Sequence, residues 1–309
     1  MIRSNLGRPV RAATLALALL AACEGKQEPA DAVPDIPDAL PDDPAQDEAP
    51  PGEAADPVED DGGPSDPAGD EGDGLCHPNG DGMIERSELR FEIGGSATYL
   101  VNAPTTTAVV DVAGDLDAGV LHWDFTAATP DDRRMIDELL PIAGRWFEAD
   151  FPGATYATVL DPNEGILGVY RLTDDALLLM GMASEEDGKI RLTYDPAVEI
   201  IRFPVRVEDR WQVETTVSGV YNWLPSTANA TYVVVVDASG VLRVPAGEFQ
   251  VTRIRVDLSQ SVPFTIFGMD NISYTFVAEC YGVIARVRST DGEENPDFTQ
   301  AAEYRRLTL

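Results

Sequence analysis

Histidine and cysteine are both scarce in this chain. Its 309 residues include two histidines and three cysteines, too few for His-centred catalysis or a His-rich metal site. No Gly-x-Ser-x-Gly, His-Glu-x-x-His, Cys-x-x-Cys or phosphate-binding glycine loop occurs. The sequence therefore indicates no familiar catalytic chemistry, and we expect a protein that is not an enzyme. A carboxylate-dependent hydrolase is the alternative, because catalytic acid pairs meet in space and not in sequence.

Basic residues are also few, 22 against 54 acidic ones, which gives a net charge of −32. A surface of this sign repels phosphates and excludes nucleic acid as a partner. The charge is uneven: residues 1–23 carry +3 and residues 24–75 carry −17, which leaves −18 for residues 76–309. These shifts in composition predict a signal peptide over 1–22, a tether over 23–75, a loop over 76–89 and a folded domain over 90–309.

The N-terminus has the pattern of a secretory signal. Three arginines precede an apolar run, Ala12 to Ala22, that ends in Leu20-Ala21-Ala22-Cys23 and is too short to span a bilayer. The tetrapeptide resembles the lipobox of bacterial lipoproteins, which implies that Cys23 becomes the lipid-modified first residue of the mature chain. Several acyl chains on one residue anchor a protein stably. Glu24 stands where Asp would signal inner-membrane retention, so we expect the outer membrane; an ordinary cleaved signal is the alternative.

The next segment is acidic and rich in proline. Residues 24–75 contain ten prolines, eighteen acids and no aromatic residue. Apolar burial cannot offset the ordering entropy of such a segment, so we predict a disordered tether. Proline and charge repulsion extend it, to ~160 Å as polyproline II at about 3.1 Å per residue. We interpret it as a spacer that holds a folded domain away from a membrane.

A short stretch after the tether, His77 to Glu88, resembles the twelve-residue EF-hand calcium loop. Gly82 falls at the sixth position, where the loop turns sharply, and Ile84 packs inward. The resemblance implies calcium as a tentative cofactor, with oxygen ligands from Asn79, Asp81, the Met83 carbonyl, Glu85 and Glu88.

This loop departs from the EF-hand pattern in two respects. His77 occupies the first position, where an acidic ligand is usual, and the entering helix is missing. Any calcium affinity is therefore expected to be low, like that of extracellular modules. A simple turn is the alternative, because Asn79-Gly80 and Asp81-Gly82 are both strong turn dipeptides.

Beyond residue 89 the pattern alternates with period two and is rich in β-branched residues. Phe249 to Leu258 is apolar on one face and polar on the other. One helix is predicted near 130–140, from the cap at Thr129-Pro130 and the apolar stripe that ends at Leu140. The fold class is therefore mainly β, a large antiparallel sheet as a sandwich or half-barrel with one short helix. Further strands are predicted over 97–101, 109–112, 119–125, 166–172, 176–183, 190–194, 232–236, 241–244, 274–281, 282–288 and 302–307, with a turn at 237–240.

The segment Val244-Pro245-Ala246-Gly247-Glu248-Phe249, followed by the strand near Gly282, resembles a motif of bacterial exported proteins of unknown function. That resemblance implies a curved half-barrel and no reaction. With Cys23 lipidated, Cys76 and Cys280 form an even pair, and we predict a disulfide between them. The sequence thus predicts an envelope lipoprotein whose partners are the membrane, through its anchor, and a protein or lipid ligand.

Overall fold

The computed structural model describes residues 76–309, apart from residues 163–164, 187 and 262–267. The chain divides into two units, Met1–Ala68 and Gly69–Leu309, and all described residues belong to the second. The predicted signal peptide, the predicted tether and Cys23 lie outside the described residues.

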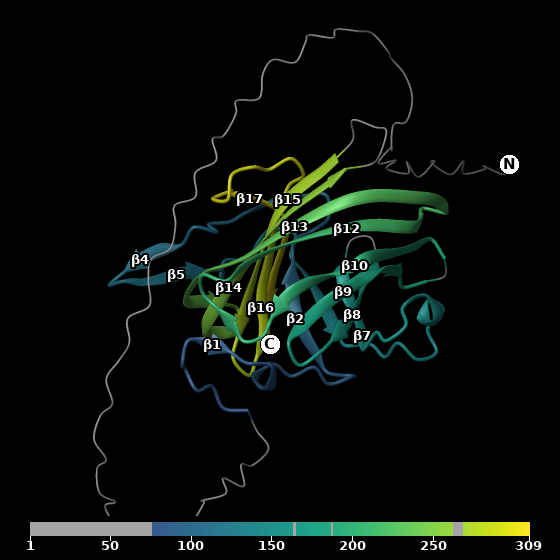
Figure 1. The fold of residues 1–309 in the computed structure, drawn as a ribbon. Helices are drawn as coiled ribbons and strands as arrows, with labels where there is room; N and C mark the ends of the chain where they lie inside the picture. Colours follow the sequence, from purple (N-terminus) through teal and green to yellow (C-terminus); the bar gives the residue numbers. More distant parts are fainter. Residues whose placement is uncertain (1–75, 163–164, 187, 262–267) are drawn as a thin grey trace, which may run out of the picture. The chain divides into compact units, whose positions relative to one another are not determined.

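The described part of the chain consists almost entirely of strands (Figure 1). Its two helical segments are single 3-10 turns, η1 (Arg86–Glu88) and η2 (Glu148–Asp150), and no helix in this part is long and apolar enough to cross a membrane. The first nine strands are β1 (Met83–Ile84), β2 (Ser96–Val101), β3 (Ala108–Val109), β4 (Asp115–Asp117), β5 (Val120–Asp124), β6 (Arg133–Glu138), β7 (Tyr156–Asp161), β8 (Ile166–Leu172) and β9 (Ala176–Ser184). The remaining strands are β10 (Ile190–Arg202), β11 (Val205–Arg206), β12 (Arg210–Tyr221), β13 (Leu224–Val244), β14 (Gly247–Ser261), β15 (Gly268–Ala278), β16 (Gly282–Ser289) and β17 (Gln300–Leu307).

Twelve strands follow one another in a single sheet, in the order β6-β2-β17-β16-β15-β14-β13-β12-β10-β9-β8-β7. The ladders along this path are antiparallel. The short strands β3, β4 and β5 lie off the path: β3 pairs with β17, β5 runs parallel to β13, and β4 pairs with β5. The two end strands, β6 and β7, meet at one backbone bridge between Leu140 and Ala157. The sheet therefore nearly closes into a barrel, and the mainly β, antiparallel fold class predicted from the sequence is confirmed.

Two large hydrophobic clusters fill this architecture. The first contains residues from β7 to β14 and includes Tyr194, Tyr232 and Trp211, with Leu89 from the N-terminal loop. The second, around Trp123, Phe125 and Phe276, lies where β3 and β5 pack on the late strands. Because strands such as β17 are buried on both faces, alternation along them is lost.

The predicted helix near 130–140 is wrong: Arg133–Glu138 form strand β6, which pairs with β2. Its burial alternates with period two, and Ile136, expected in the apolar stripe, is 66% exposed. Asp132, expected in the first helical turn, accepts a hydrogen bond from the Thr129 amide and closes a turn there. The free edge of β2 needs a backbone partner, and this demand overrides the local helical signal.

The predicted turn at 237–240 is also absent. β13 continues through it for 21 residues, from Leu224 to Val244, with a register shift between Val236 and Ala238. Asp237 is paired with Arg253 of β14, with 2.8 Å between Oδ1 and Nε. A turn-like sequence thus becomes a bulge, because the neighbouring strand continues alongside it.

Candidate functional site

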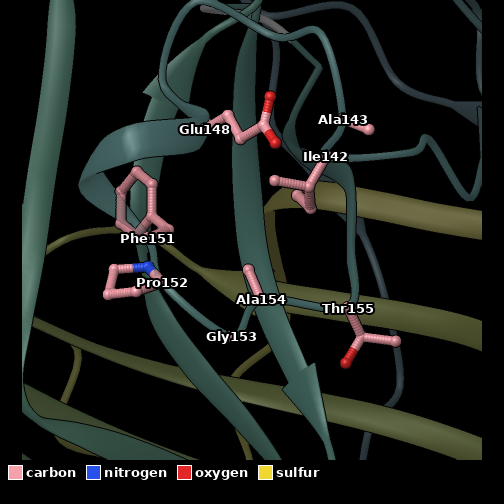
Figure 2. A pocket seen from close by; sticks show the side chains of 8 residues that line it. All are labelled: Ile142, Ala143, Glu148, Phe151, Pro152, Gly153, Ala154 and Thr155. Carbon is pink, nitrogen blue, oxygen red and sulfur yellow. The ribbon is translucent and has the colours of Figure 1, made fainter.

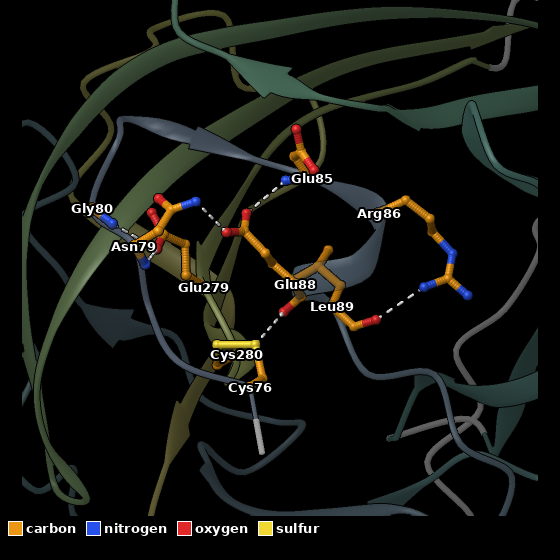
Figure 3. The surroundings of a disulfide bond; sticks show 9 residues. All are labelled: Cys76, Asn79, Gly80, Glu85, Arg86, Glu88, Leu89, Glu279 and Cys280. Carbon is orange, nitrogen blue, oxygen red and sulfur yellow. Dashed lines mark hydrogen bonds between the residues drawn. A yellow bond between two sulfur atoms is a disulfide. The ribbon is translucent and has the colours of Figure 1, made fainter. Parts of the chain in front are cut away.

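The N-terminal loop is attached to the late strands by a disulfide between Cys76 and Cys280, the pair expected from the sequence (Figure 3). Backbone contacts reinforce the attachment: the Cys280 amide donates to the Glu88 carbonyl at 2.8 Å. Glu279, next to the cysteine, accepts hydrogen bonds from the amides of Asn79 and Gly80 at 2.7 and 3.0 Å. No sequence pattern singled out Glu279; its position beside Cys280 is the signal that could have found it.

The loop folds back on itself through its own side chains. Asn79 Oδ1 accepts from the Asp81 amide, and Asp81 Oδ1 accepts from the Met83 amide. Glu88 returns on the short turn η1, so that its Oε1 accepts from Asn79 Nδ2 at 2.8 Å and its Oε2 accepts from the Glu85 amide at 2.8 Å. Gly80 and Gly82 have φ of 67° and 83°, a left-handed conformation that glycine permits at these turns.

Of the predicted calcium ligands, the structure brings the side chains of Asn79 and Glu88 into direct contact, and Glu85 contacts Glu88 through its backbone amide. Asp81 remains exposed, and its carboxylate accepts a hydrogen bond from the Met83 amide. No group of three or more His, Cys, Asp or Glu side chains gathers at one point within the described ranges. The loop therefore brings Glu88 back toward Asn79, and a hydrogen bond joins the two side chains.

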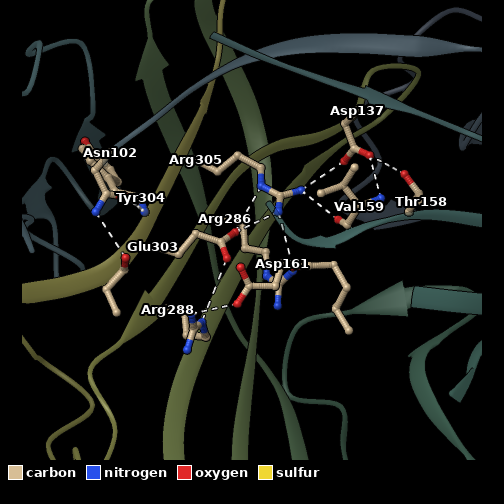
Figure 4. Close-up of polar contacts among 12 residues, drawn as sticks. Asn102, Asp137, Thr158, Val159, Asp161, Arg286, Arg288, Glu303, Tyr304 and Arg305 are labelled. Atoms are coloured by element: carbon tan, nitrogen blue, oxygen red, sulfur yellow. Dashed lines mark hydrogen bonds and ion pairs between the residues drawn. The ribbon is translucent and has the colours of Figure 1, made fainter. Parts of the chain in front are cut away.

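A second polar cluster lies on the inner side of the sheet, where charged side chains are buried (Figure 4). Arg305 and Glu303, both on β17, form an ion pair with 2.9 Å between Nη2 and Oε1. Arg305 Nη1 also contacts Asp137 of β6 at 3.0 Å and the Val159 carbonyl of β7. Arg286 Nη1 donates to the Leu160 carbonyl, and Arg288 Nη2 lies 3.6 Å from Asp161 Oδ2.

This cluster spans the closure of the sheet. One backbone bridge joins Leu140, just beyond β6, to β7, and arginine side chains from β16 and β17 also reach β7. Asp137 of β6 contacts two other strands. Its carboxylate pairs with Arg305 of β17 and also accepts hydrogen bonds from the Thr158 hydroxyl and the Val159 amide of β7. The ion pairs and hydrogen bonds of this cluster therefore join the two ends of the sheet, and we call the cluster the clasp.

The pKa of Glu303 reflects this environment. Burial alone would raise the pKa, but Arg305, Arg286 and Arg288 outweigh burial and hold it below its ordinary value. A general acid in a carboxylate-dependent hydrolase needs the opposite shift. Burial does raise the pKa of Asp257 on β14, whose carboxylate lies 3.2 Å from Arg255 Nε.

Two hollows on the described part of the surface are shallow. One, of about 380 Å³, is lined by backbone and apolar groups around η2, with Glu148 as its charged side chain (Figure 2). The other follows the N-terminal loop from Arg86 to Glu92, beside Cys76. Glu88, in this second hollow, is already hydrogen-bonded to Asn79 and to the Glu85 amide.

The four tryptophans do not line a common groove. Trp123 and Trp211 are buried in separate hydrophobic clusters. Trp146 is partly exposed and donates to the Ser184 carbonyl, and Trp223 is largely exposed at the turn between β12 and β13.

Comparison with known proteins adds two distant matches. No family model and no curated protein matches the chain. A solved protein of Parabacteroides distasonis, named as a candidate lipoprotein, shares 12% identity with a TM-score of 0.34, over 70% of this chain and 96% of that chain. A candidate exported protein with a YmcC-like fold from Bacteroides fragilis shares 11% identity with a TM-score of 0.34, over 70% of this chain and 94% of that one. Similarity at this level assigns no function to the chain.

Proposed function

We propose that this chain is an exported lipoprotein, anchored in the outer membrane through Cys23, whose β domain is a binding or structural module of the envelope. The observation that carries the proposal is the disulfide between Cys76 and Cys280. Structural disulfides persist in oxidising compartments and are rare in the cytosol. Because Cys76 and Cys280 pair with each other, the remaining cysteine is Cys23, at the end of the lipobox-like tetrapeptide.

The anchor is tested by fractionating a bacterium that has a lipoprotein pathway. The wild-type chain is expected in the membrane fraction, because acyl chains on Cys23 add membrane affinity with every buried methylene. Cys23→Ala is expected to lose this acyl-dependent partitioning, which labelling with a radioactive fatty acid detects directly. Glu24→Gln, next to the cysteine, is a matched control that should remain labelled. Equal labelling of wild type and Cys23→Ala would contradict the proposal.

We also propose that the loop from His77 to Glu88 binds calcium weakly. The return of Glu88 to within 2.8 Å of Asn79 supports this, because the twelfth and third positions of a calcium loop must converge. Binding would replace the hydrogen bond between these side chains with shared coordination, together with the Asp81 carboxylate, the Met83 carbonyl and Glu85. A dissociation constant of about 10⁻⁴–10⁻³ M is typical of extracellular sites with few charged ligands.

Calcium binding is tested by thermal unfolding of the full chain at zero and 10 mM calcium. A ligand that binds the folded state raises the unfolding temperature once its concentration exceeds the dissociation constant. The eighteen carboxylates of residues 24–75 are expected to bind calcium equally before and after unfolding, so they do not move the midpoint. Wild type should gain a few degrees and Glu88→Gln should not, whereas Glu92→Gln serves as the matched control. A calcium shift that is absent from wild type, or retained in Glu88→Gln, would show that the loop is only a turn.

A further inference from the structure

The turn between β12 and β13 exposes several large apolar side chains together. Tyr221, Trp223 and Leu224 are 37%, 65% and 61% exposed. Scattered apolar residues are ordinary on a surface, but a gathering at one turn is typical of an interaction site. β12 and β13 run side by side to this turn (Figure 1), and the Trp223 amide donates to the Lys189 carbonyl of the turn between β9 and β10.

Trp223 occupies a backbone conformation that favours other residues. Asn222 and Trp223 have φ of 50° and 67°, the left-handed values required at both central positions of a tight hairpin turn. Glycine and asparagine suit these positions, whereas a bulky side chain is rare there. Strained residues of this kind concentrate at functional sites. The turn itself would favour a smaller residue than tryptophan. The indole lies over Gly188 of the turn between β9 and β10, yet most of its surface remains exposed and available for a contact outside the domain.

The hairpin formed by β12 and β13 carries no charge of its own near the turn. Residues 215–236 contain no acidic or basic residue, although a quarter of the chain is charged and residues 76–309 carry −18. Leu258–Ser261, paired with β13, carries no charge either. Leu116, another exposed apolar side chain, stands instead between Asp115 and Asp117. The tip of the β12–β13 hairpin can therefore approach an apolar medium without burying a charge of its own, while the neighbouring turn keeps its charged side chains at the headgroups.

The chain outside the described residues is long enough to bring this turn to a membrane. Cys76 is fixed to Cys280 at the end of β15, and β15 runs from there for about ten residues toward the end of the sheet that carries the turn. β13 extends about five residues further, from Asn229 to Leu224. The separation along the strands is thus at most ~50 Å at about 3.3 Å per residue. Residues 24–75 can span ~160 Å when fully extended.

We propose that Tyr221, Trp223 and Leu224 insert into the headgroup region of a phospholipid bilayer, which gives the anchored domain a second membrane contact. The proposal rests on the lipid anchor proposed above to keep the domain near the membrane. Tryptophan and tyrosine favour the interface between headgroups and hydrocarbon, and the leucine adds apolar burial. The adjacent turn carries Glu185, Glu186 and Lys189, and the domain is acidic, so zwitterionic lipid is favoured over anionic lipid.

The test uses the full lipidated chain in phosphatidylcholine vesicles whose acyl chains carry bromine, which quenches tryptophan fluorescence on contact. Wild-type emission is expected to fall by the share that comes from Trp223, one of four tryptophans. Trp223→Asn should lose this quenching and still fold, because asparagine suits the left-handed conformation. Leu224→Ser retains the fluorophore and should show reduced quenching. Trp146→Phe, the matched control at the other partly exposed tryptophan, should retain the quenching.

Flotation of the same vesicles separates this proposal from the anchor. If wild type floats but is not quenched, or if Trp223→Asn loses the same fraction of emission, the bilayer contact is overturned and the anchor stands. If wild type does not float, the anchor fails, and quenching with excess vesicles still decides whether the turn contacts lipid. Self-association that disappears in Trp223→Asn, without quenching of wild type, would overturn the proposal in favour of a second copy of the chain.

Discussion

Replacing both cysteines of the disulfide, as Cys76→Ser with Cys280→Ser, is expected to lower the free energy of unfolding by roughly 5 kcal/mol. The bond closes a loop of 204 residues, so its removal releases a large conformational entropy in the unfolded chain. The loss would be a substantial part of the stability of an ordinary domain, which is about 5–15 kcal/mol. Chemical denaturation of the oxidised wild type and the double variant measures it.

Reduction provides the control for this prediction. A reductant should destabilise wild type to the level of the double variant and leave the double variant unchanged. Local contacts should weaken as well, since Glu279 and the Cys280 amide hold the loop through Asn79, Gly80 and Glu88. Identical denaturation midpoints for wild type and the double variant would show that these hydrogen bonds suffice without the covalent bond.

Replacing Arg305 by methionine is expected to cost about 3–5 kcal/mol of stability, because it leaves Glu303 and Asp137 without their shared cation in the interior. The carbonyls of Val159 and Leu160 lose a donor at the same time. Arg305→Lys should fall between methionine and wild type, since an ammonium cannot contact both carboxylates with the same fork geometry. Equilibrium denaturation at pH 7 gives these differences.

An exposed arginine is the matched control for this second prediction. Arg243 pairs with Asp124 on the surface at 3.3 Å, so Arg243→Met should cost no more than about 1 kcal/mol. The pH dependence adds an independent readout. The pKa of Glu303 is lowered in the folded state, so its contribution is fully present above the unfolded value near 4.5 and is lost as the pH falls through the folded value. Glu303→Gln should lack this part of the destabilisation at acid pH. If Arg305→Met and Arg243→Met lowered the free energy of unfolding equally, the stabilising role of the clasp would be contradicted.

Short-range patterns predicted individual strands well, whether one face of the strand is buried or both are. Ile166–Leu172 matches β8 residue for residue, and Phe249 to Leu258 falls within β14. The same reasoning failed at Arg133–Glu138, where a helical stripe was expected, and at Asp237, where a turn was expected. In both places a neighbouring strand offered backbone hydrogen bonds that no local sequence pattern contains.

Within the candidate sites, sequence reasoning identified the residues that interact locally and missed those that meet across the sheet. The contact between Asn79 and Glu88 follows from loop spacing, because both belong to one short segment. The clasp of Glu303, Arg305 and Asp137 joins residues up to 168 positions apart. Alternation cannot reveal such a cluster, since the two faces of β17 are both buried.

By itself the sequence determined the mainly β class, the uneven charge and the cysteine pair available for a disulfide. These depend on composition, on period-two alternation and on counting, which are local or additive properties. Tertiary structure alone decided that β6 is a strand, that the sheet nearly closes, and that an uncharged turn carries Tyr221, Trp223 and Leu224 outward. Each of these depends on which strand lies beside which, and that choice is made by backbone hydrogen bonding and burial over the whole sheet.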